Sequence, residues 1–153
     1  NLLENFLLKK ISLLVKNKIK LKIIGNRKLF TNKLKKILKE SEQKTKNNRN
    51  LQINLALNYG SKNEILNAFK LICKSKKPLS EKNIEDNLYT KNIPDPDILI
   101  RTGETNRLSN FLLWQLAYTE IFFEKKLWPD FKANDYNKIM NKFKILKRNF
   151  GSI

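Results

Sequence analysis

Short apolar segments alternate with helix-like segments along most of this chain of 153 residues. Apolar segments of strand length lie at 21–24, 51–57 and 98–100, and the stretches between them carry apolar residues at helical spacing. Parallel strands need a long crossover, usually a helix, because the chain must return to the same edge of the sheet. The pattern therefore predicts an α/β fold, with a mostly parallel sheet flanked by helices, in a single domain over 1–153.

Local signals place the helices. They are expected at 2–16, 30–46, 61–74, 80–89, 110–118 and 134–150, and a short fourth strand is expected at 121–123. Ser61 and Glu64 form a Ser-x-x-Glu capping box, Ser80 can cap the next helix, and Gly151 can end the last one. No turn or cap precedes Leu2, so the chain begins as if inside a helix. We therefore expect the carboxyl-terminal portion of a longer protein, with its first strands missing.

The charge is strongly positive, at +18, from 32 basic and 14 acidic residues. Such an excess can indicate a nucleic-acid or anionic-membrane partner. However, only five of the basic residues are arginine, and the lysines are spread along the chain among abundant Asn and Ile. All three of these residue types have AT-rich codons, so base composition explains the excess more simply. A basic nucleic-acid-binding domain remains the less favoured alternative, because it needs clustered arginines or stacking aromatic residues.

Residue types that are absent or rare exclude several chemistries. The chain has no histidine, which excludes Ser-His and Cys-His catalysis and histidine-based zinc sites. The single cysteine, Cys73, excludes an intrachain disulfide, and its apolar helical surroundings predict a buried structural thiol. No apolar run reaches the roughly 18 residues needed to span a bilayer.

The three expected strands end on polar residues or glycine, at 25–26, 58–60 and 101–103. In a parallel sheet the carboxyl ends of the strands lie at one edge, which is where ligands bind. We therefore expect these three exits to contribute to one site.

The third exit carries two arginines, Arg101 and Arg107, six residues apart. Guanidinium groups bind phosphate oxygens through charge-assisted hydrogen bonds. Ser109 and Asn110 stand at the start of the next expected helix, where free N–H groups favour an anion. The pattern indicates a diphosphate clamp, but a surface loop whose arginines pair with acids such as Glu104 fits the spacing equally well.

The segment 94–131 closely resembles the carboxyl-terminal signature of the cis-prenyltransferases, the undecaprenyl diphosphate synthase family. That signature reads roughly R-T-[SG]-G-E-x-R-[LI]-S-N-F-L-L-W-Q, and the match continues through Leu-Trp-Pro-Asp-Phe at 127–131. The resemblance implies that Arg101, Arg107 and Ser109 hold the diphosphate of isopentenyl diphosphate, with Leu108 in the same substrate-binding set.

The resemblance also implies a reaction. It is cis-prenyl chain elongation, in which isopentenyl diphosphate condenses with an allylic diphosphate such as farnesyl diphosphate to make a polyprenyl carrier lipid. Mg²⁺ is the implied cofactor, and Glu120 is the implied ligand, offered towards the partner's site in a homodimer. A solvated acid beside Lys125 and Lys126 is the alternative for Glu120. The apolar stretch 111–118 would be divided between core and dimer interface, in a cytoplasmic enzyme with peripheral membrane contact and no nucleic-acid partner.

The family's catalytic aspartate, in its amino-terminal H-x-x-M-D-G-N-x-R-W-A motif, has no counterpart in these 153 residues. The sequence is therefore expected to supply the clamp and the dimer interface but no catalytic residue, and to be inactive alone. The rival within the family is the non-catalytic subunit of a heteromeric prenyltransferase. Such subunits usually lose the arginine-serine clamp, which is intact here at Arg101, Arg107 and Ser109.

Overall fold

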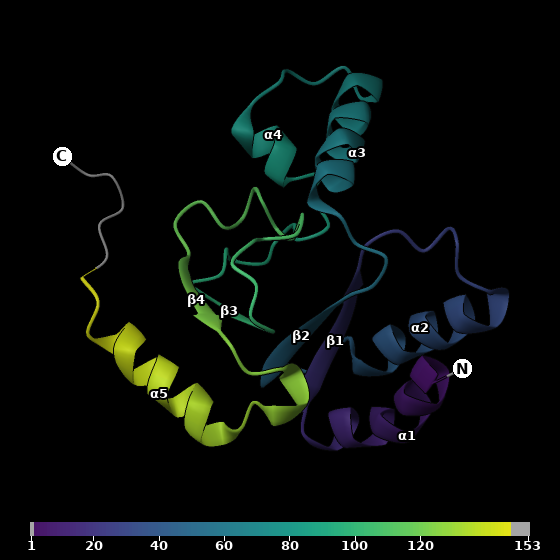
Figure 1. Cartoon of the computed structure of the whole chain (residues 1–153). Coiled ribbons are helices and arrows are strands. Elements are labelled where there is room, and N and C mark those ends of the chain that lie inside the picture. The colour runs from purple at the N-terminus through teal and green to yellow at the C-terminus, as the bar shows by residue number, and fades with distance from the viewer. Residues whose placement is uncertain (1, 148–153) are drawn as a thin grey trace. The chain divides into compact units, whose positions relative to one another are not determined.

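A computed structural model of the chain describes residues 2–147 and divides into two compact units, 1–91 and 92–153 (Figure 1). Each unit contains one pair of strands, and both pairs are parallel. The predicted α/β class with parallel strands flanked by helices is therefore confirmed. That the whole chain forms a single domain stays a prediction.

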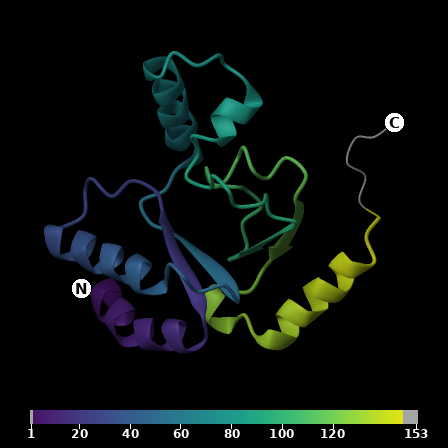
Figure 2. The same cartoon turned by 180° about the vertical axis from the view of Figure 1, so that it is seen from behind.

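The first unit alternates helices and strands in the predicted order. Its elements are α1 (Leu2–Lys16), β1 (Ile19–Ile24), α2 (Asn32–Thr45), β2 (Leu51–Ala56), α3 (Ser61–Lys74) and α4 (Glu81–Glu85). Strand β1 pairs with β2 in a register that runs from Ile19 opposite Leu51 to Ile24 opposite Ala56. Helices α1 and α2 contact each other and β1, and both views show them side by side along the strand pair (Figures 1 and 2).

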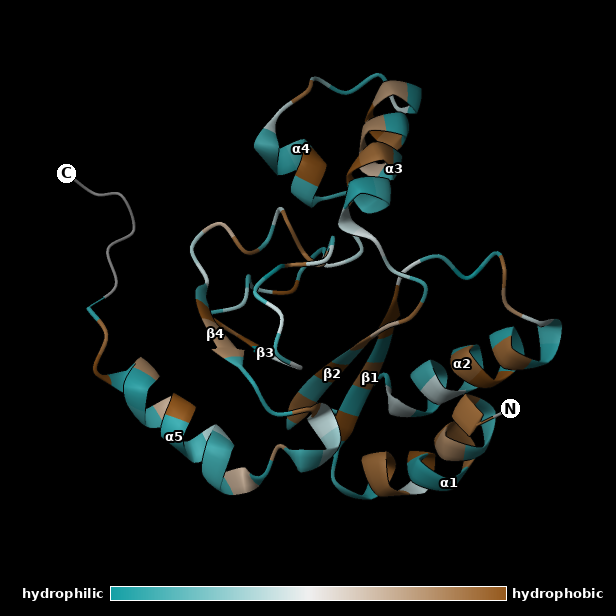
Figure 3. Ribbon diagram, viewed as in Figure 1, coloured by the Kyte–Doolittle hydropathy of each residue, from teal (hydrophilic) through white to brown (hydrophobic). Residues whose placement is uncertain are grey.

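The core of the first unit lies between these two helices and the sheet. Both helices carry hydrophobic and hydrophilic residues in alternation along their length (Figure 3), as expected when only one face is buried. Each buried leucine or isoleucine stabilises the fold by about 1.5–3 kcal/mol. The fully buried hydroxyl Oγ1 of Thr45 accepts a bond from the Leu21 amide (3.1 Å) and so fixes α2 to β1. The core cluster consists of Leu7, Leu21, Ile23, Leu34, Ile37 and Leu38.

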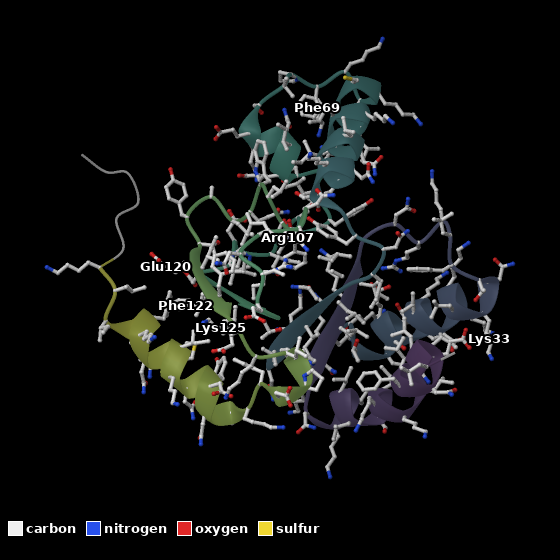
Figure 4. All side chains as sticks on the ribbon, viewed as in Figure 1. Lys33, Phe69, Arg107, Glu120, Phe122 and Lys125 are labelled. Carbon is white, nitrogen blue, oxygen red and sulfur yellow. The ribbon has the colours of Figure 1, made fainter. Side chains whose placement is uncertain are left out.

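Buried or capping polar groups secure the starts of the helices. Glu4 of α1 is buried and forms an ion pair with Lys33 of α2 (3.2 Å; Lys33 is labelled in Figure 4). Thr31 caps α2, because its Oγ1 accepts a bond from the Leu34 amide (3.2 Å). The Ser80 hydroxyl caps α4 as predicted, although that helix ends at Glu85 rather than near residue 89.

The predicted capping box of α3 is wrong. The N-cap is Gly60 rather than Ser61, and glycine has no side chain with which to cap the helix. The carboxylate of Glu64 accepts bonds instead from the Tyr59 hydroxyl (2.5 Å) and the Tyr89 amide (2.7 Å). Tyr59 precedes α3 and Tyr89 follows α4, so Glu64, which is only 1% exposed, ties together the two ends of the α3–α4 region.

The prediction of a buried Cys73 is also wrong, because its thiol is exposed. Helix α3 buries Ala68 and Ile72 on one face. Cys73 follows Ile72 directly, and one residue turns the side chain by about 100° around a helix, away from that face. None of the helices among residues 2–147 is long and apolar enough to cross a membrane.

The second unit contains β3 (Ile98–Thr102), β4 (Glu120–Glu124), the short 3-10 helix η1 (Trp128–Asp130) and α5 (Ala133–Lys144). Strands β3 and β4 are parallel, with Ile98 opposite Glu120 and Thr102 opposite Glu124. The fourth strand is thus confirmed. Helix α5 ends at Lys144 rather than at residue 150, and the predicted stop at Gly151 lies outside the described residues.

The helix predicted at 110–118 is wrong, because this stretch forms consecutive turns. Ser109, Asn110 and Leu112 have φ angles of 48°, 60° and 45°. These left-handed residues interrupt the ladder of a right-handed helix. Only a short helical turn remains, in which the Leu116 amide donates to the Leu112 carbonyl (3.0 Å).

Candidate functional site

A cavity of about 390 Å³ lies in the second unit beside the carboxyl-terminal half of β3. The fold brings residues 99–102 of the strand together with residues 108, 109 and 111, which follow a connecting loop. Three of the four predicted substrate-binding residues therefore share one cavity. Its lining consists of Leu99, Ile100, Arg101, Thr102, Leu108, Ser109 and Phe111.

Arg101 is held in place at the edge of this cavity. It is half-buried in β3 opposite Phe123, and its Nε donates to the Thr105 hydroxyl (2.8 Å). Among the described residues, neither Arg101 nor Arg107 forms an ion pair with Glu104, the pairing that a plain surface loop would favour. The Thr105 bond uses only one of the five guanidinium N–H donors, so the remaining donors can serve a ligand.

The connection between the two arginines, residues 103–107, is called the clamp loop below. It begins with two positive φ angles, +98° at Gly103 and 58° at Glu104. The Gly103 amide donates to the carbonyl of Lys126 (2.9 Å), and the Glu104 amide donates more weakly to the carbonyl of Glu124 (3.4 Å). Backbone bonds to the last residue of β4 and to Lys126, just beyond it, thus fix the loop's first two residues.

The positions of Arg107 and Ser109 differ from the predicted clamp geometry. Both are exposed, and Arg107, which is labelled in Figure 4, is absent from the lining of the cavity. Because residues 110–118 form turns, Ser109 and Asn110 do not stand at a helix N-terminus, and no helix dipole assists an anion there. The groups that the cavity offers to an anion are therefore a guanidinium and hydroxyls rather than a helix N-terminus.

Glu120 lies at the other end of the strand pair from the clamp. It begins β4 opposite Ile98, and its amide donates to the Asp97 carbonyl (3.1 Å). Arg101 lies three residues further along β3, which corresponds to about 10 Å. Figure 4 likewise shows Glu120 beside β4 and Arg107 apart from it. Among residues 2–147, no three acidic, cysteine or histidine side chains gather into a metal site.

The exits of β1 and β2 lie together in the first unit, as predicted for two of the three strand exits. The Asn26 amide donates to the Asn58 carbonyl (3.1 Å), and the Asn58 side-chain amide donates back to the Asn26 carbonyl (2.9 Å). Gly25 adopts a φ of +111°, and a Cβ there would lie 2.2 Å from the Leu57 carbonyl oxygen. The proximity of these two exits to the third one stays a prediction.

An ion pair that the sequence does not predict lies near the clamp loop. Lys126 Nζ lies 2.6 Å from Asp135 Oδ1, and Asp135 Oδ2 accepts a bond from the Lys132 amide at the start of α5 (2.9 Å). The hydrogen bond from Lys126 lowers the pKa of the Asp135 carboxyl, and the same bond raises the pKa of Lys126. An acid in the first turn of a helix is a known signal, but nothing local indicates that Lys126 is its partner.

Comparison with known proteins gives a consistent result. The prenyltransferase family model for undecaprenyl diphosphate synthase matches residues 1–151. The isoprenyl transferase of Rickettsia typhi is 41% identical over 156 residues, which cover 96% of this chain and 69% of that protein. The isoprenyl transferase of Clostridium tetani is 40% identical, with 99% of this chain and 62% of that protein covered.

Two crystal structures share the fold. One, assigned as an undecaprenyl diphosphate synthase from Campylobacter jejuni, has a TM-score of 0.89 and 35% identity, and covers 99% of this chain and 72% of its own. The other is lavandulyl diphosphate synthase from Lavandula x intermedia in complex with dimethylallyl diphosphate. Its TM-score is 0.91 with 31% identity, and the match covers 97% of this chain and 68% of the lavender protein.

Proposed function

Because the chain belongs to the undecaprenyl diphosphate synthase family of prenyltransferases, we propose that the cavity beside β3 binds the diphosphate of isopentenyl diphosphate. In this role the chain takes part in cis-prenyl chain elongation. Isopentenyl diphosphate condenses with an allylic diphosphate, such as farnesyl diphosphate. Each condensation releases the allylic diphosphate group and a proton, and the growing product is a polyprenyl diphosphate. Because that product is a membrane lipid, peripheral contact with a membrane belongs to the same proposal.

The observation that carries the proposal is the meeting of Arg101, Leu108 and Ser109 at one cavity. A guanidinium group remains charged at any relevant pH and can grip two phosphate oxygens at once. Thr105 already orients the Arg101 guanidinium through Nε, so less side-chain entropy is lost when a ligand binds. The Ser109 hydroxyl can donate one further bond to the diphosphate.

The cavity has an apolar side as well as a charged side. Leu108 and Phe111 line it next to Arg101 and Ser109. A ligand with a diphosphate at one end and a five-carbon alkene at the other matches this division. The charged groups would fix the diphosphate, and the apolar side chains would orient the alkene and exclude water.

Arg107 would complete the clamp. Its side chain is exposed at the end of the clamp loop and makes no hydrogen bond with another described residue. A long, mobile cation can therefore turn onto a multiply charged ligand without breaking an existing bond. Two guanidinium groups on one diphosphate would act together rather than independently.

Glu120 fits a magnesium site only as a single ligand. Mg²⁺ is commonly held by one or two carboxylates together with substrate phosphates and water, and Glu120 offers one carboxylate. Its place at the far end of β4 from the clamp supports a role in the site of a partner subunit in a homodimer. When bound, Mg²⁺ would neutralise charge on a diphosphate group.

The direct test is calorimetric titration of the chain with isopentenyl diphosphate. Losing one charge-assisted hydrogen bond costs about 1.5–3 kcal/mol, so Arg101→Ala should weaken binding about 10- to 150-fold. Arg49→Ala is the matched control, because it removes an exposed arginine from the loop before β2. Equal affinities of the wild type and Arg101→Ala would refute the clamp.

A further inference from the structure

The start of the clamp loop is held by the end of β4 and by Lys126, which lies just outside the strand ladder. Gly103 and Glu104 hold left-handed backbone angles of +98° and 58°, and a non-glycine residue persists there only when its surroundings fix it. The fixing bonds come from the carbonyls of Lys126 (2.9 Å) and Glu124 (3.4 Å). The shorter bond is therefore made to a residue two positions beyond the end of β4.

Side-chain contacts, rather than strand pairing, hold Lys126 in position. Its amide donates to the carboxylate of Glu124 (3.1 Å), and its Nζ lies 2.6 Å from Asp135 Oδ1. The Glu124 bond is local, because its partners are only two residues apart. The Asp135 bond reaches to another element, α5.

Asp135 is a well-anchored partner. Its side chain is only 9% exposed, and its second oxygen accepts the Lys132 amide (2.9 Å). It lies in the first turn of α5, where the helix dipole favours a negative charge. A carboxylate held at both oxygens offers a fixed point to which the lysine can bind.

We propose that Lys126 and Asp135 are positioning residues for the diphosphate clamp. Their ion pair fixes the Lys126 carbonyl, the carbonyl fixes Gly103, and Gly103 sets the path of the loop between the two arginines. The inference rests on the proposed function of the cavity. Since Lys126 remains 47% exposed, the pair should add little to global stability. Its effect should instead appear in the geometry of the loop, where a displacement of about 1 Å can cost a hundredfold in activity.

The test compares two variants that remove the same charge from one cavity of about 500 Å³. Lys126 and Lys142 both line this cavity, but only Lys126 is paired with Asp135. Two quantities are measured on the whole chain: amide hydrogen exchange at Gly103 by NMR, and affinity for isopentenyl diphosphate by calorimetry. Lys126→Met should speed exchange at Gly103 and weaken binding, each by roughly tenfold for a lost hydrogen bond. Lys142→Met should change neither, and Lys126→Arg should restore both.

The exchange measurement needs no ligand, so the two proposals can fail separately. Unchanged exchange at Gly103 in Lys126→Met would overturn the positioning role. If exchange rises while neither the wild type nor Arg101→Ala binds isopentenyl diphosphate, the pair fixes the loop but the proposed clamp is wrong. Should Lys126→Met fail to fold, Asp135→Asn, which keeps an acceptor for the Lys132 amide, takes its place. Unfolding of both variants would make the pair structural and would also overturn the proposal.

Discussion

Thr105 orients the guanidinium group of Arg101 by accepting a hydrogen bond from it. Its hydroxyl is the only described partner of the Arg101 side chain (2.8 Å). Thr105→Val keeps the shape and the charge of the site but removes this acceptor. A hydrogen bond from a charged group contributes about 1.5–3 kcal/mol, so losing this acceptor should lower the affinity for isopentenyl diphosphate by up to about 10- to 150-fold. Thr105→Ser should retain the wild-type affinity in the same titration, and equal losses in both variants would contradict the orienting role.

The ion pair between Lys126 and Asp135 should make its small contribution to stability across a wide pH window. The hydrogen bond from Lys126, followed by that from the Lys132 amide, lowers the pKa of Asp135 below 3.8, and the bond to Asp135 raises the pKa of Lys126 above 10.5. The contribution of Asp135 is therefore fully present above pH 3.8 and is lost as the pH falls through the lower folded value. That of Lys126 is fully present below pH 10.5 and is lost as the pH rises through the higher folded value.

Urea unfolding of the wild type and of Lys126→Met can check this window. The difference in the free energy of unfolding should be constant between pH 3.8 and pH 10.5 and should shrink on either side. A difference that already varies with pH near neutrality would contradict the pairing. Lys142→Met, which leaves the pair intact, should show no such profile.

The exits of the strands depend on two glycines whose environments differ. Both Gly25 and Gly103 have left-handed φ angles, but a Cβ at Gly25 would lie 2.2 Å from the Leu57 carbonyl oxygen, whereas a Cβ at Gly103 would meet nothing closer than 4.0 Å. Backbone strain alone costs about 1–3 kcal/mol. Gly103→Ala should lose about this much in the free energy of unfolding, and Gly25→Ala should lose clearly more. If urea unfolding gave equal losses in the free energy of unfolding for both variants, the backbone at Gly25 would have to shift to make room for the Cβ.

The elements that the sequence predicts correctly are those whose signal lies in neighbouring residues. Apolar periodicity placed α1 at its observed ends and gave β1 and β2 to within two residues. The errors come from distant partners or from missing periodicity. The side chain of Glu64 does not form the expected capping box, and it accepts a hydrogen bond from the backbone amide of Tyr89, 25 residues away. Nearly every residue of the stretch 111–118 is apolar. The spacing of apolar residues therefore cannot distinguish a helix from the turns that form there.

The candidate site shows the same division. Arg101, Leu108 and Ser109 were predicted from a contiguous motif, and the fold brings them to one cavity. The contact between Lys126 and Asp135 depends on how α5 returns towards β4 after η1, and no local pattern encodes that path. The sequence therefore predicts the groups that would touch a ligand but not those that hold them in place.

The charge of the whole molecule leads to a prediction about nucleic acid. If the excess of +18 reflects base composition, binding to mixed-sequence DNA should be weak and should fall steeply with added salt, because only phosphate neutralisation drives it. Fluorescence anisotropy across a salt series would measure this. Submicromolar binding that persists at physiological salt would favour the nucleic-acid-binding alternative.

The last prediction separates binding from turnover in the chain as a whole. The sequence contains the residues of the proposed clamp but no counterpart of the family's amino-terminal aspartate motif. We therefore expect residues 1–153 to bind isopentenyl diphosphate and to form no polyprenyl product with farnesyl diphosphate and Mg²⁺. The assay uses radiolabelled isopentenyl diphosphate and extraction of the lipid product, with the Rickettsia typhi isoprenyl transferase as the positive control. Product formation by the chain would mean that other residues replace the aspartate. Arg101→Ala would then show whether that turnover still depends on the clamp.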